Sequence, residues 1–397
     1  MTTLERARAL DAADALRGFA DEFDLPAGVI YLDGNSLGPP PRRALARLRD
    51  AAETDWRRGL VRSWNDADWI DLPARAGAKI ARLIGAASED VIVCDSVSVN
   101  LFKLAAALAA RRPGATLAVD AGEFPTDQYV LEGVARMTGA ALTRLDGRAP
   151  PKNSVLVQSL VHYRSAEILD MAAAEQEAAA QDFDIIWDLS HAAGLIPVDV
   201  RGAGARFAVG CGYKFLNGGP GAPGFIYVAR GDADAMAQPL SGWMGHAAPF
   251  DFAGAYAPAA GVRRFAAGTP PILSLCALDA ALDIFDGVDL GALEAKARAL
   301  GDFFLGATEG LGLGVHALPE RRGGHVCLRH AHGYEIMQAL IAHGVIGDFR
   351  APDLMRFGFS PLFLSFEDVS NAAGVLADIL STEEWRRPEF SRRGKVT

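Results

Sequence analysis

Short apolar runs that favour β-strands alternate with helix-like stretches through the middle of the chain. The strand-like runs cover residues 91–94, 115–119, 154–160, 184–188, 206–210 and 224–228. The helix-like stretches that separate several of them are 98–111, 126–138 and 170–181. Such alternation predicts an α/β fold with a mainly parallel sheet covered by helices on both faces. Ligands bind beyond the carboxyl ends of the strands in these sheets, so we look for chemistry just after each run.

The two ends of the chain do not continue this alternation of strand-like and helix-like segments. Residues 1–60 predict two helices around an irregular segment, 31–41, in which Pro39 to Pro41 exclude a regular strand. After about residue 285, helical spacing at 289–308 is followed by strands at 323–330 and 345–350 around a helix at 333–343, which predicts a small α+β domain. The last fifteen or so residues are polar and predict a surface tail.

These patterns predict three parts in a chain of 397 residues, which is too long for one small core. We expect residues 1–60 to form an N-terminal segment that packs with the small domain. Residues 61–284 would form the large domain and residues 285–397 the small α+β domain.

Composition narrows the classes of partner and compartment. The net charge is −10 and no run of Lys or Arg forms a stripe, which disfavours binding to nucleic acid or to an anionic membrane. The four cysteines, Cys94, Cys211, Cys276 and Cys327, form no CxxC pair, which favours a reduced, cytoplasmic setting. No uncharged apolar run reaches the length of a membrane span, and residues 1–13 read as an amphipathic helix and not as a secretory signal.

Three pieces of the chain have the residue types that pyridoxal phosphate (PLP) chemistry requires. The strand 184–188 ends on Asp188, and Lys214 follows a later strand. A lysine amine forms an imine with the cofactor's aldehyde, and a carboxylate keeps the pyridine nitrogen protonated. The segment 95–100 follows a strand, contains short hydroxyl and amide side chains and opens a helix, as a phosphate cup does. A solvated lysine and an aspartate that caps a helix are the simpler alternatives for the first two.

From Tyr31 to about Asp368 the chain resembles kynureninase, in the class V aminotransferase-like group of fold-type-I PLP enzymes. The motifs that carry the resemblance are Tyr31-Leu-Asp-Gly-Asn-Ser-Leu-Gly38, Phe124-Pro-Thr-Asp127, Trp187-Asp-Leu-Ser-His191, Gly212-Tyr-Lys-Phe-Leu-Asn-Gly-Gly-Pro-Gly221, Gly242-Trp-Met-Gly-His246, Gly268-Thr-Pro-Pro-Ile272 and Arg356-Phe-Gly-Phe-Ser-Pro361. The resemblance implies a large domain with a seven-stranded sheet, a homodimer and hydrolytic Cβ–Cγ cleavage of L-kynurenine, or also of its 3-hydroxy form, to anthranilate and L-alanine. The role implied is in tryptophan catabolism or the supply of NAD precursors.

The same resemblance implies a role for each matching residue. Lys214 is the Schiff-base lysine and proton carrier, Asp188 the partner of the pyridinium, and Tyr213 a phosphate contact and proton donor. The other expected cofactor contacts within the subunit are Val97, Ser98, Phe124, Asp127, Ser165 and His191, with Ser98 standing where a threonine is common. Trp243 and Thr269 match positions that contact the phosphate of the neighbouring subunit. Arg356 would bind the substrate α-carboxylate, for which a bidentate guanidinium is the natural partner. Ser36 and Trp64 would lie near the substrate.

Several other interpretations are weaker. A cysteine desulfurase or an aminotransferase of the same group is the nearest alternative, followed by a PLP-binding regulator. Gly34-Asn-Ser-Leu-Gly38 fits the nucleophile elbow of serine hydrolases but lacks the strand and helix that the elbow needs. Gly219-Pro-Gly-Ala-Pro-Gly224 fits a dinucleotide motif but opens a strand, which predicts a turn. His325, Cys327, His330 and His332 lack the paired spacing of zinc sites, so we expect no metal there.

Overall fold

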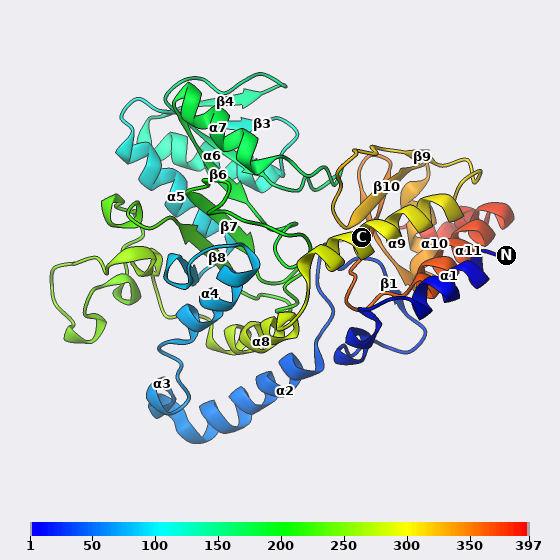
Figure 1. The fold of residues 1–397 in the computed structure, drawn as a ribbon, viewed down its shortest axis with the longest axis horizontal. Helices are drawn as coiled ribbons and strands as arrows, with labels where there is room; N and C mark the ends of the chain where they lie inside the picture. Colours follow the sequence, from blue (N-terminus) through cyan, green and yellow to red (C-terminus); the bar gives the residue numbers. More distant parts are fainter. Residues whose placement is uncertain (1, 395–397) are drawn as a thin grey trace. The chain divides into compact units, whose positions relative to one another are not determined.

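The computed structural model describes residues 2–394 and divides the chain into two compact units (Figure 1). Unit 1 comprises the described residues of Met1–Arg42, Arg164–Ile168 and Gly287–Thr397. Unit 2 comprises Arg43–Tyr163 and Leu169–Asp286. Each unit has its own sheet and its own apolar core.

A seven-stranded sheet forms the centre of unit 2. Its strands, in the order β2-β8-β7-β6-β5-β3-β4, are β2 (Val91–Val93), β8 (Gly224–Val228), β7 (Phe207–Cys211), β6 (Phe183–Asp188), β5 (Ser154–Ser159), β3 (Thr116–Asp120) and β4 (Ala141–Leu145). Only β8 runs antiparallel to its neighbours. The expectation of a mainly parallel seven-stranded sheet is therefore confirmed.

Helices connect the strands of unit 2 through crossovers. The α-helices are α2 (Arg42–Asp50), which starts in unit 1, α3 (Ser63–Asp66), α4 (Leu72–Leu83), α5 (Val97–Arg111), α6 (Pro125–Thr138), α7 (Met171–Gln181) and α8 (Ile272–Leu282). A π-helical stretch, Ala51–Gly59, continues α2. The units β3-α6-β4 and β5-α7-β6 step in opposite directions along the sheet, so right-handed crossovers place α6 and α7 on opposite faces.

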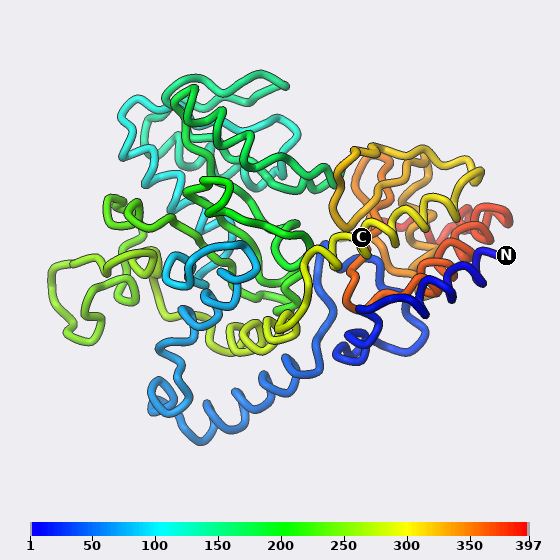
Figure 2. The backbone as a smooth tube through the Cα atoms, viewed as in Figure 1, coloured from blue at the N-terminus to red at the C-terminus, as the bar shows by residue number. Residues whose placement is uncertain are grey.

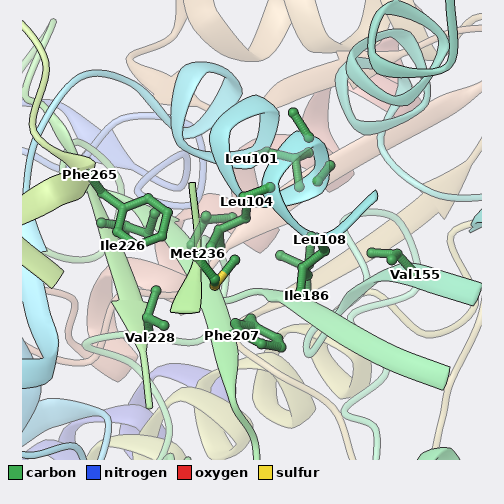
Figure 3. Packing of buried hydrophobic residues seen from close by; sticks show 14 of the residues in the cluster. Leu101, Leu104, Leu108, Val155, Ile186, Phe207, Ile226, Val228, Met236 and Phe265 are labelled. Carbon is green, nitrogen blue, oxygen red and sulfur yellow. The ribbon is translucent and has the colours of Figure 1, made fainter. Parts of the chain in front are cut away.

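The core of unit 2 lies between α5 and the sheet (Figure 3). Leu101, Leu104 and Leu108 recur at helical spacing along α5 and are fully buried. They face side chains such as Ile186 and Phe207 from β6 and β7. Because the strands are covered on both faces, their residues form continuous apolar runs, which is why the sequence identified them.

The chain between β8 and α8 leaves this sheet as an irregular excursion (Figure 2). It contains short 3-10 turns at Ala233–Ala235, Trp243–Gly245, Pro249–Asp251 and Gly261–Phe265. The segment before β8 is also irregular: Gly219 and Gly221 have φ of 84° and 77°, and β8 begins at Gly224. The turn predicted for residues 219–224 is therefore confirmed.

Unit 1 contains a four-stranded antiparallel sheet in the order β12-β13-β10-β9. Its strands are β12 (Asp348–Arg350), β13 (Leu354–Gly358), β10 (His325–Arg329) and β9 (Gly314–Val315). A parallel pair joins β1 (Ile30–Tyr31) to β11 (Val345–Ile346). The helices are α1 (Thr3–Ala12), α9 (Leu290–Ala307), α10 (Gly333–Ala342) and α11 (Phe366–Thr382). This is the small α+β arrangement that the helical spacing and strand-like runs after about residue 285 predict.

The pairing of β1 with β11 ties residues from the start of the chain to the small sheet. Leu32 N donates to Ile346 O at 2.6 Å, and Gly358 N donates to Leu32 O at 2.7 Å. The segment from Asp33 to Gly38 is thereby held beside β12 and β13. Only two strand residues precede Gly34, and α2 begins after Pro41, so residues 34–38 are not a nucleophile elbow.

The surface tail predicted for the last fifteen residues is wrong over its described part. Trp385 and Phe390 are 7% and 8% exposed, within 3-10 turns at Glu384–Arg386 and Pro388–Ser391. The His332 ring stacks on Trp385 at 4.4 Å between centroids. Two aromatic side chains in a polar stretch are enough to pack the segment against α10.

No helix among the described residues is long and apolar enough to cross a membrane. All four cysteines are free and buried. Within residues 2–394, no cluster of His, Cys, Asp and Glu side chains has an arrangement that could hold a metal ion.

Candidate active site

The parallel strands of unit 2 bring polar side chains to one edge of the sheet. Strands β2, β3, β5, β6 and β7 all point the same way, so the residues that follow them lie at the same edge. Asp188 is the last residue of β6 and pairs in register with Ser159, the last residue of β5. Lys214 follows β7 in a turn. The sequence-based expectation that Asp188 and Lys214 share an edge is consistent with this topology.

Lys214 has a histidine and two aromatic rings around its amine. Nζ lies 3.0 Å from Nε2 of His191, which is 7% exposed. The amine is 5.9 Å from the centroid of the Phe124 ring and 6.0 Å from that of Tyr213. A lysine that were only a solvated surface charge would have no such enclosure.

Three buried carboxylates surround the same edge. Asp188 is 8% exposed, and one of its oxygens accepts a hydrogen bond from Ser190 N at 2.8 Å. Glu123 is 2% exposed and accepts bonds from Ser159 N and Ser159 Oγ at 2.8 and 2.6 Å. Asp127 is 1% exposed, and neither of its oxygens has a hydrogen-bond partner in the protein.

Burial and nearby charges shift the ionisation of two of these acids, Asp127 and Glu123. Loss of solvation raises the pKa of Asp127 well above its ordinary value; the charges on Asp188 and Glu123 add to this, and Lys214 opposes it. Burial also raises the pKa of Glu123, against the bonds from Ser159. Shifted carboxylates gathered around a lysine mark a functional site more often than a structural one.

The unpartnered carboxylate of Asp127 indicates what kind of group this edge would hold. A buried carboxylate without a donor costs free energy, so the pocket favours a ligand with a hydrogen-bond donor or a positive charge. Phe124 is 38% exposed and offers a ring face. An aromatic, cationic ring that carries an aldehyde for Lys214 fits this set of residues, and PLP is such a group.

The start of α5 offers backbone donors for a phosphate. Ser96 caps the helix by accepting from Val99 N, and the N–H groups of Val97 and Ser98 belong to its first turn. Gly224 passes close by, because a Cβ at that position would lie 2.9 Å from Val97 N. The buried Lys103 Nζ contacts the Asp95 carboxylate and donates to Phe265 O at 2.5 Å. These two contacts connect the loop before α5 to the segment that contains Phe265.

Tyr213 is half-buried and directly precedes Lys214. Burial raises the pKa of its phenol above its ordinary value, with the thiol of Cys211 as the next contribution. The phenol is therefore protonated at neutral pH and can donate.

Trp243, Thr269 and Trp64 also belong to unit 2, and Thr269 lines a cavity that Asp95 of the loop before α5 lines as well. The rings of Trp64 and Trp243 meet edge to face with centroids 6.3 Å apart. Thr269 lines a cavity of about 190 Å³ together with Cys94 and Met244. In residues 2–394, no hydrogen bond or ring contact joins these three side chains to Lys214.

Arg356, in unit 1, is 2% exposed and engages Asp348 through two bonds. Nε donates to Oδ1 at 2.9 Å and Nη2 to Oδ2 at 2.5 Å. Nη2 also donates to Ser36 Oγ at 2.8 Å. The Asn35 side-chain oxygen accepts from Nε at 3.0 Å once its amide is turned to satisfy both groups. Arg356 and Ser36, which were each predicted from the sequence to lie near the substrate, are thus in direct contact.

Ser165 lies in the short segment Arg164–Ile168, which the structure assigns to unit 1. Its hydroxyl accepts a hydrogen bond from Glu167 N at 3.3 Å. The segment pairs with the loop before β10, since Gly323 N donates to Ala166 O at 2.7 Å.

The sequence did not identify Glu123, Asp348, Asp33 or Asn35. Glu123 follows the strand-like run 115–119, and Asp33 and Asn35 stand inside the motif 31–38, so position could have pointed to these three. Asp348 had no such signal, because only the pairing of β12 with β13 places it beside Arg356.

Comparison with known proteins gives matches over the whole chain. A kynureninase from Burkholderia mallei (strain SAVP1) is 44% identical, covering 100% of both chains, and one from Deinococcus radiodurans is 48% identical, covering 95% of this chain and 96% of the relative. The family model described as the kynureninase C-terminal domain matches residues 293–376.

Solved structures share the fold at much lower identity. A cysteine desulfurase from Thermococcus onnurineus NA1 superposes with a TM-score of 0.80 at 19% identity, covering 92% of this chain and 98% of that one. A mutant of C-DES with glycine covalently linked to its PLP cofactor superposes with a TM-score of 0.76 at 16% identity, covering 89% and 97%.

The fold, together with the lysine and the carboxylates at the sheet edge, defines a fold-type-I enzyme that uses PLP. Because identity to the relatives extends over the full length, the chain belongs to the kynureninase family and is a PLP-dependent hydrolase.

Proposed function

We propose that this enzyme hydrolyses the Cβ–Cγ bond of L-kynurenine to give anthranilate and L-alanine. The observation that best supports the chemistry is the Lys214 amine at a sheet edge with three buried carboxylates. The substrate follows from membership of the family. PLP, when bound, withdraws electrons from the substrate's Cα so that a proton can leave it.

Lys214 would hold the cofactor through its aldehyde, and its Nζ would carry the proton that leaves the substrate's Cα. Asp188 would accept a hydrogen bond from the cofactor's ring nitrogen and so favour the protonated form of that nitrogen. Tyr213 donates a proton or a hydrogen bond through its phenol, which its burial keeps protonated. These three residues form the proposed catalytic set.

The other proposed contacts within the subunit bind and orient the cofactor. Val97 and Ser98 donate to the phosphate at the start of α5. Phe124 would offer its ring face to the cofactor, and Asp127 and His191 would contact the cofactor and help to orient it. Ser165 supplies a further hydroxyl.

The substrate contacts are proposed to come from Arg356, Ser36 and Trp64. Arg356 binds the α-carboxylate, because a guanidinium matches a carboxylate with two parallel hydrogen bonds. Ser36 shares a bond with Arg356 Nη2, which supports a place beside the same carboxylate. Trp64 offers an aromatic face to the substrate ring.

We also propose a homodimer in which Trp243 and Thr269 reach the phosphate of the partner subunit. Thr269 is exposed, and Trp243 lies in the irregular excursion between β8 and α8. An exposed position on an excursion is what a contact with a second subunit requires. The proposed setting is the cytoplasm, in tryptophan breakdown or NAD-precursor supply, which the free, buried cysteines support.

A cysteine desulfurase is disfavoured by the state of the thiols. That reaction needs a reactive cysteine on an accessible loop. Cys94, Cys211, Cys276 and Cys327 are all buried, none more than 6% exposed, and burial raises the pKa of each thiol. No thiolate of useful population is available at neutral pH.

The decisive experiment follows anthranilate fluorescence after L-kynurenine is added to the PLP-loaded protein, with Lys214→Ala as the comparison. We expect emission from the wild type and a loss of at least about a thousandfold in the variant, because the covalent route is lost. A yellow, PLP-loaded wild type without anthranilate would reject the substrate, and a protein that binds no PLP would reject the proposal as a whole.

A further inference from the structure

The Arg356 guanidinium is held by a carboxylate on the neighbouring strand. Asp348 of β12 and Arg356 of β13 are opposite each other in the antiparallel register, so both side chains point to the same face. Asp348 occupies the Nε–Nη2 edge with its two oxygens, at 2.9 and 2.5 Å. Two bonds to one carboxylate fix the plane of the guanidinium as well as its position.

Asp348 is itself held from two further directions. Arg350 Nη2 lies 2.7 Å from Asp348 Oδ2, and Ser36 Oγ donates to the same oxygen at 2.9 Å. Asp348 is 3% exposed. A carboxylate with this many donors has little freedom to rotate, so it can transmit the geometry of the sheet to Arg356.

A second carboxylate faces this pair. Asp33 lies in the segment that β1 holds beside β12 and β13, and its Oδ1 is buried without a hydrogen-bond partner. Its charge interacts with those of Asp348, Arg356 and Arg350. Tyr31 and Cys327 also lie close to these charges, and burial raises the pKa of each, which keeps both neutral near pH 7. Arg164 adds a further positive charge beside Cys327.

We propose that Asp348 and Asp33 are positioning residues for Arg356: Asp348 sets the orientation of the guanidinium, and Asp33 sets the net charge that a substrate carboxylate meets there. The inference rests on the proposed role of Arg356 and goes beyond it by assigning the two acids that control it. Neither acid needs to touch the substrate.

The charge count explains the part played by Asp33. Arg350 and Arg356 contribute two positive charges and Asp348 one negative charge. Together with Asp33, these three residues are therefore net positive when Asp33 is protonated and neutral when it is ionised, and Arg164 adds a positive charge nearby in either state. Burial and the charge on Asp348 raise the pKa of Asp33 to about 7, so this change falls in the working range of an enzyme. An anionic ligand binds better to the net positive state.

The test uses the PLP-loaded enzyme and two simple ligands. L-alanine carries the α-carboxylate and L-alaninamide does not, and binding of either changes the cofactor's absorbance. We expect Asp348→Asn to raise the Kd for L-alanine by at least about tenfold, since a misaligned guanidinium loses one of two parallel bonds. The Kd for L-alaninamide should change less than about twofold, because it does not use the guanidinium's charge.

Two further variants separate positioning from folding. Asp348→Glu keeps the charge and should recover part of the L-alanine affinity. Asp353→Asn changes a more exposed acid between β12 and β13, whose nearest cation, Arg329, is 3.9 Å away, and should bind both ligands like the wild type. An equal loss for both ligands in Asp348→Asn, or no loss for either, would overturn the role of Asp348.

Asp33→Asn tests how the negative charge of Asp33 affects the binding of L-alanine, and it leaves the shape of the site almost unchanged. The ratio of wild-type to variant Kd for L-alanine, measured between about pH 6 and pH 9, cancels the titration of every other group. We expect this ratio to rise about three- to tenfold as the pH passes 7, because only the wild type gains a negative charge. A ratio that stays flat with pH would overturn the role of Asp33.

These measurements separate the inference from the proposed function. Release of anthranilate from L-kynurenine tests the reaction, whereas the two alanine ligands test only how Arg356 recognises a carboxylate. A wild type that binds L-alanine but makes no anthranilate would reject the reaction and leave the positioning test intact. A wild type with no preference for L-alanine over its amide would reject the role of Arg356 and, with it, this inference.

Discussion

The carboxylate of Asp127 is buried, and neither of its two oxygens accepts a hydrogen bond from the protein. Desolvation by burial, together with Asp188 and Glu123, raises its pKa well above the ordinary value. A raised carboxyl pKa means that the folded protein holds a proton which the unfolded chain has already released. The stabilising contribution is complete below the unfolded pKa and is lost as the pH rises through the folded pKa.

We therefore predict opposite effects of Asp127→Asn on the apoprotein and on cofactor binding. In the wild-type apoprotein, the unfolding free energy should fall above about pH 4, by up to about 1.4 kcal/mol per pH unit while this group alone titrates. The variant should lack this decline and be the more stable protein at pH 8. The same variant should bind PLP at least about tenfold more weakly, because an amide cannot ionise to give the charged acceptor that a cationic ring favours.

Urea denaturation of both apoproteins over a range of pH measures the first effect, and absorbance titration with PLP measures the second. Asp146→Asn, an exposed change in the loop after β4, is the matched control and should alter neither. If Asp127→Asn destabilises the apoprotein at every pH, the prediction is wrong, because the carboxylate must then accept a stabilising hydrogen bond in the wild type.

Single residues differ in how well their roles can be predicted from the chain alone. Asp188 is the last residue of one strand-like run and Lys214 follows shortly after another, so local pattern predicts that both lie at a sheet edge. Arg356 was identified through its motif, but its partner Asp348 was not, because register across two strands is a property of the folded sheet. The roles of the site residues remain predictions until variants are measured.

At the scale of elements, the start of β8 and the start of α5 approach within van der Waals contact. A Cβ on Gly224 would lie 2.9 Å from Val97 N and 3.0 Å from Gly210 O, and both neighbours are backbone atoms that cannot rotate away. The glycine therefore allows the proposed phosphate-binding turn to sit directly on the sheet.

Gly224→Ala should lower the unfolding free energy by about 1–3 kcal/mol, as overpacking against backbone does. It should also weaken PLP binding by at least about tenfold, because the N–H groups of α5 move from their positions. Both changes are measurable by urea denaturation and by titration of the apoprotein with PLP.

Gly133→Ala in α6 is the control, because no atom lies within 4 Å of the added Cβ. That change should stabilise the helix by about 0.5–1 kcal/mol and leave PLP affinity unchanged. A Gly224→Ala variant that binds PLP like the wild type would show that the two elements do not need their close approach.

The elements of the large sheet were predicted best where the strands are buried on both faces. Strands β2, β3, β5, β6, β7 and β8 fall on the six apolar runs within one or two residues. The edge strand β4 was missed, because Ala141–Leu145 mixes exposed and buried positions and has no continuous apolar run. The error at the C-terminus has the opposite cause, since two aromatic side chains pack a segment whose composition is polar.

For the whole molecule, an exposed apolar group supports the proposed homodimer. Trp56, Leu60 and Val61 are 58%, 61% and 76% exposed and lie within one segment of unit 2, Ala51–Arg62. Large apolar side chains scattered singly need no explanation, but three within six residues favour a protein interface.

The double change Leu60→Asp and Val61→Asp should convert the dimer into monomers, because it would place two carboxylates in a contact that excludes water. Light scattering coupled to gel filtration measures the mass. Leu318→Asp, at a position in unit 1 with a similar 60% exposure, should leave the dimer intact. A wild type that elutes as a monomer at every concentration would contradict the proposed assembly.

The division of the chain into units also belongs to this scale. The boundaries predicted after residues 60 and 284 remain predictions about how the chain behaves in solution. In the structure the chain passes from unit 1 to unit 2 after Arg42 and from unit 2 to unit 1 after Asp286. Residues 164–168, between these boundaries, also belong to unit 1. Limited proteolysis would show which set of boundaries yields stable fragments.

The α/β class, the strands of the large sheet except β4, and the positions of Asp188 at the end of one strand and Lys214 after another were all predictable from the sequence, because these features depend on local pattern. The motifs added the family, which the full-length relatives confirm. Tertiary structure alone decided which charges face one another. Glu123, Asp127 and Asp188 meet at one sheet edge, and Asp33 and Asp348 surround Arg356, through strand order and register. The ionisation of Asp33, Glu123 and Asp127 depends on burial and on neighbours distant in the chain, which no local pattern encodes.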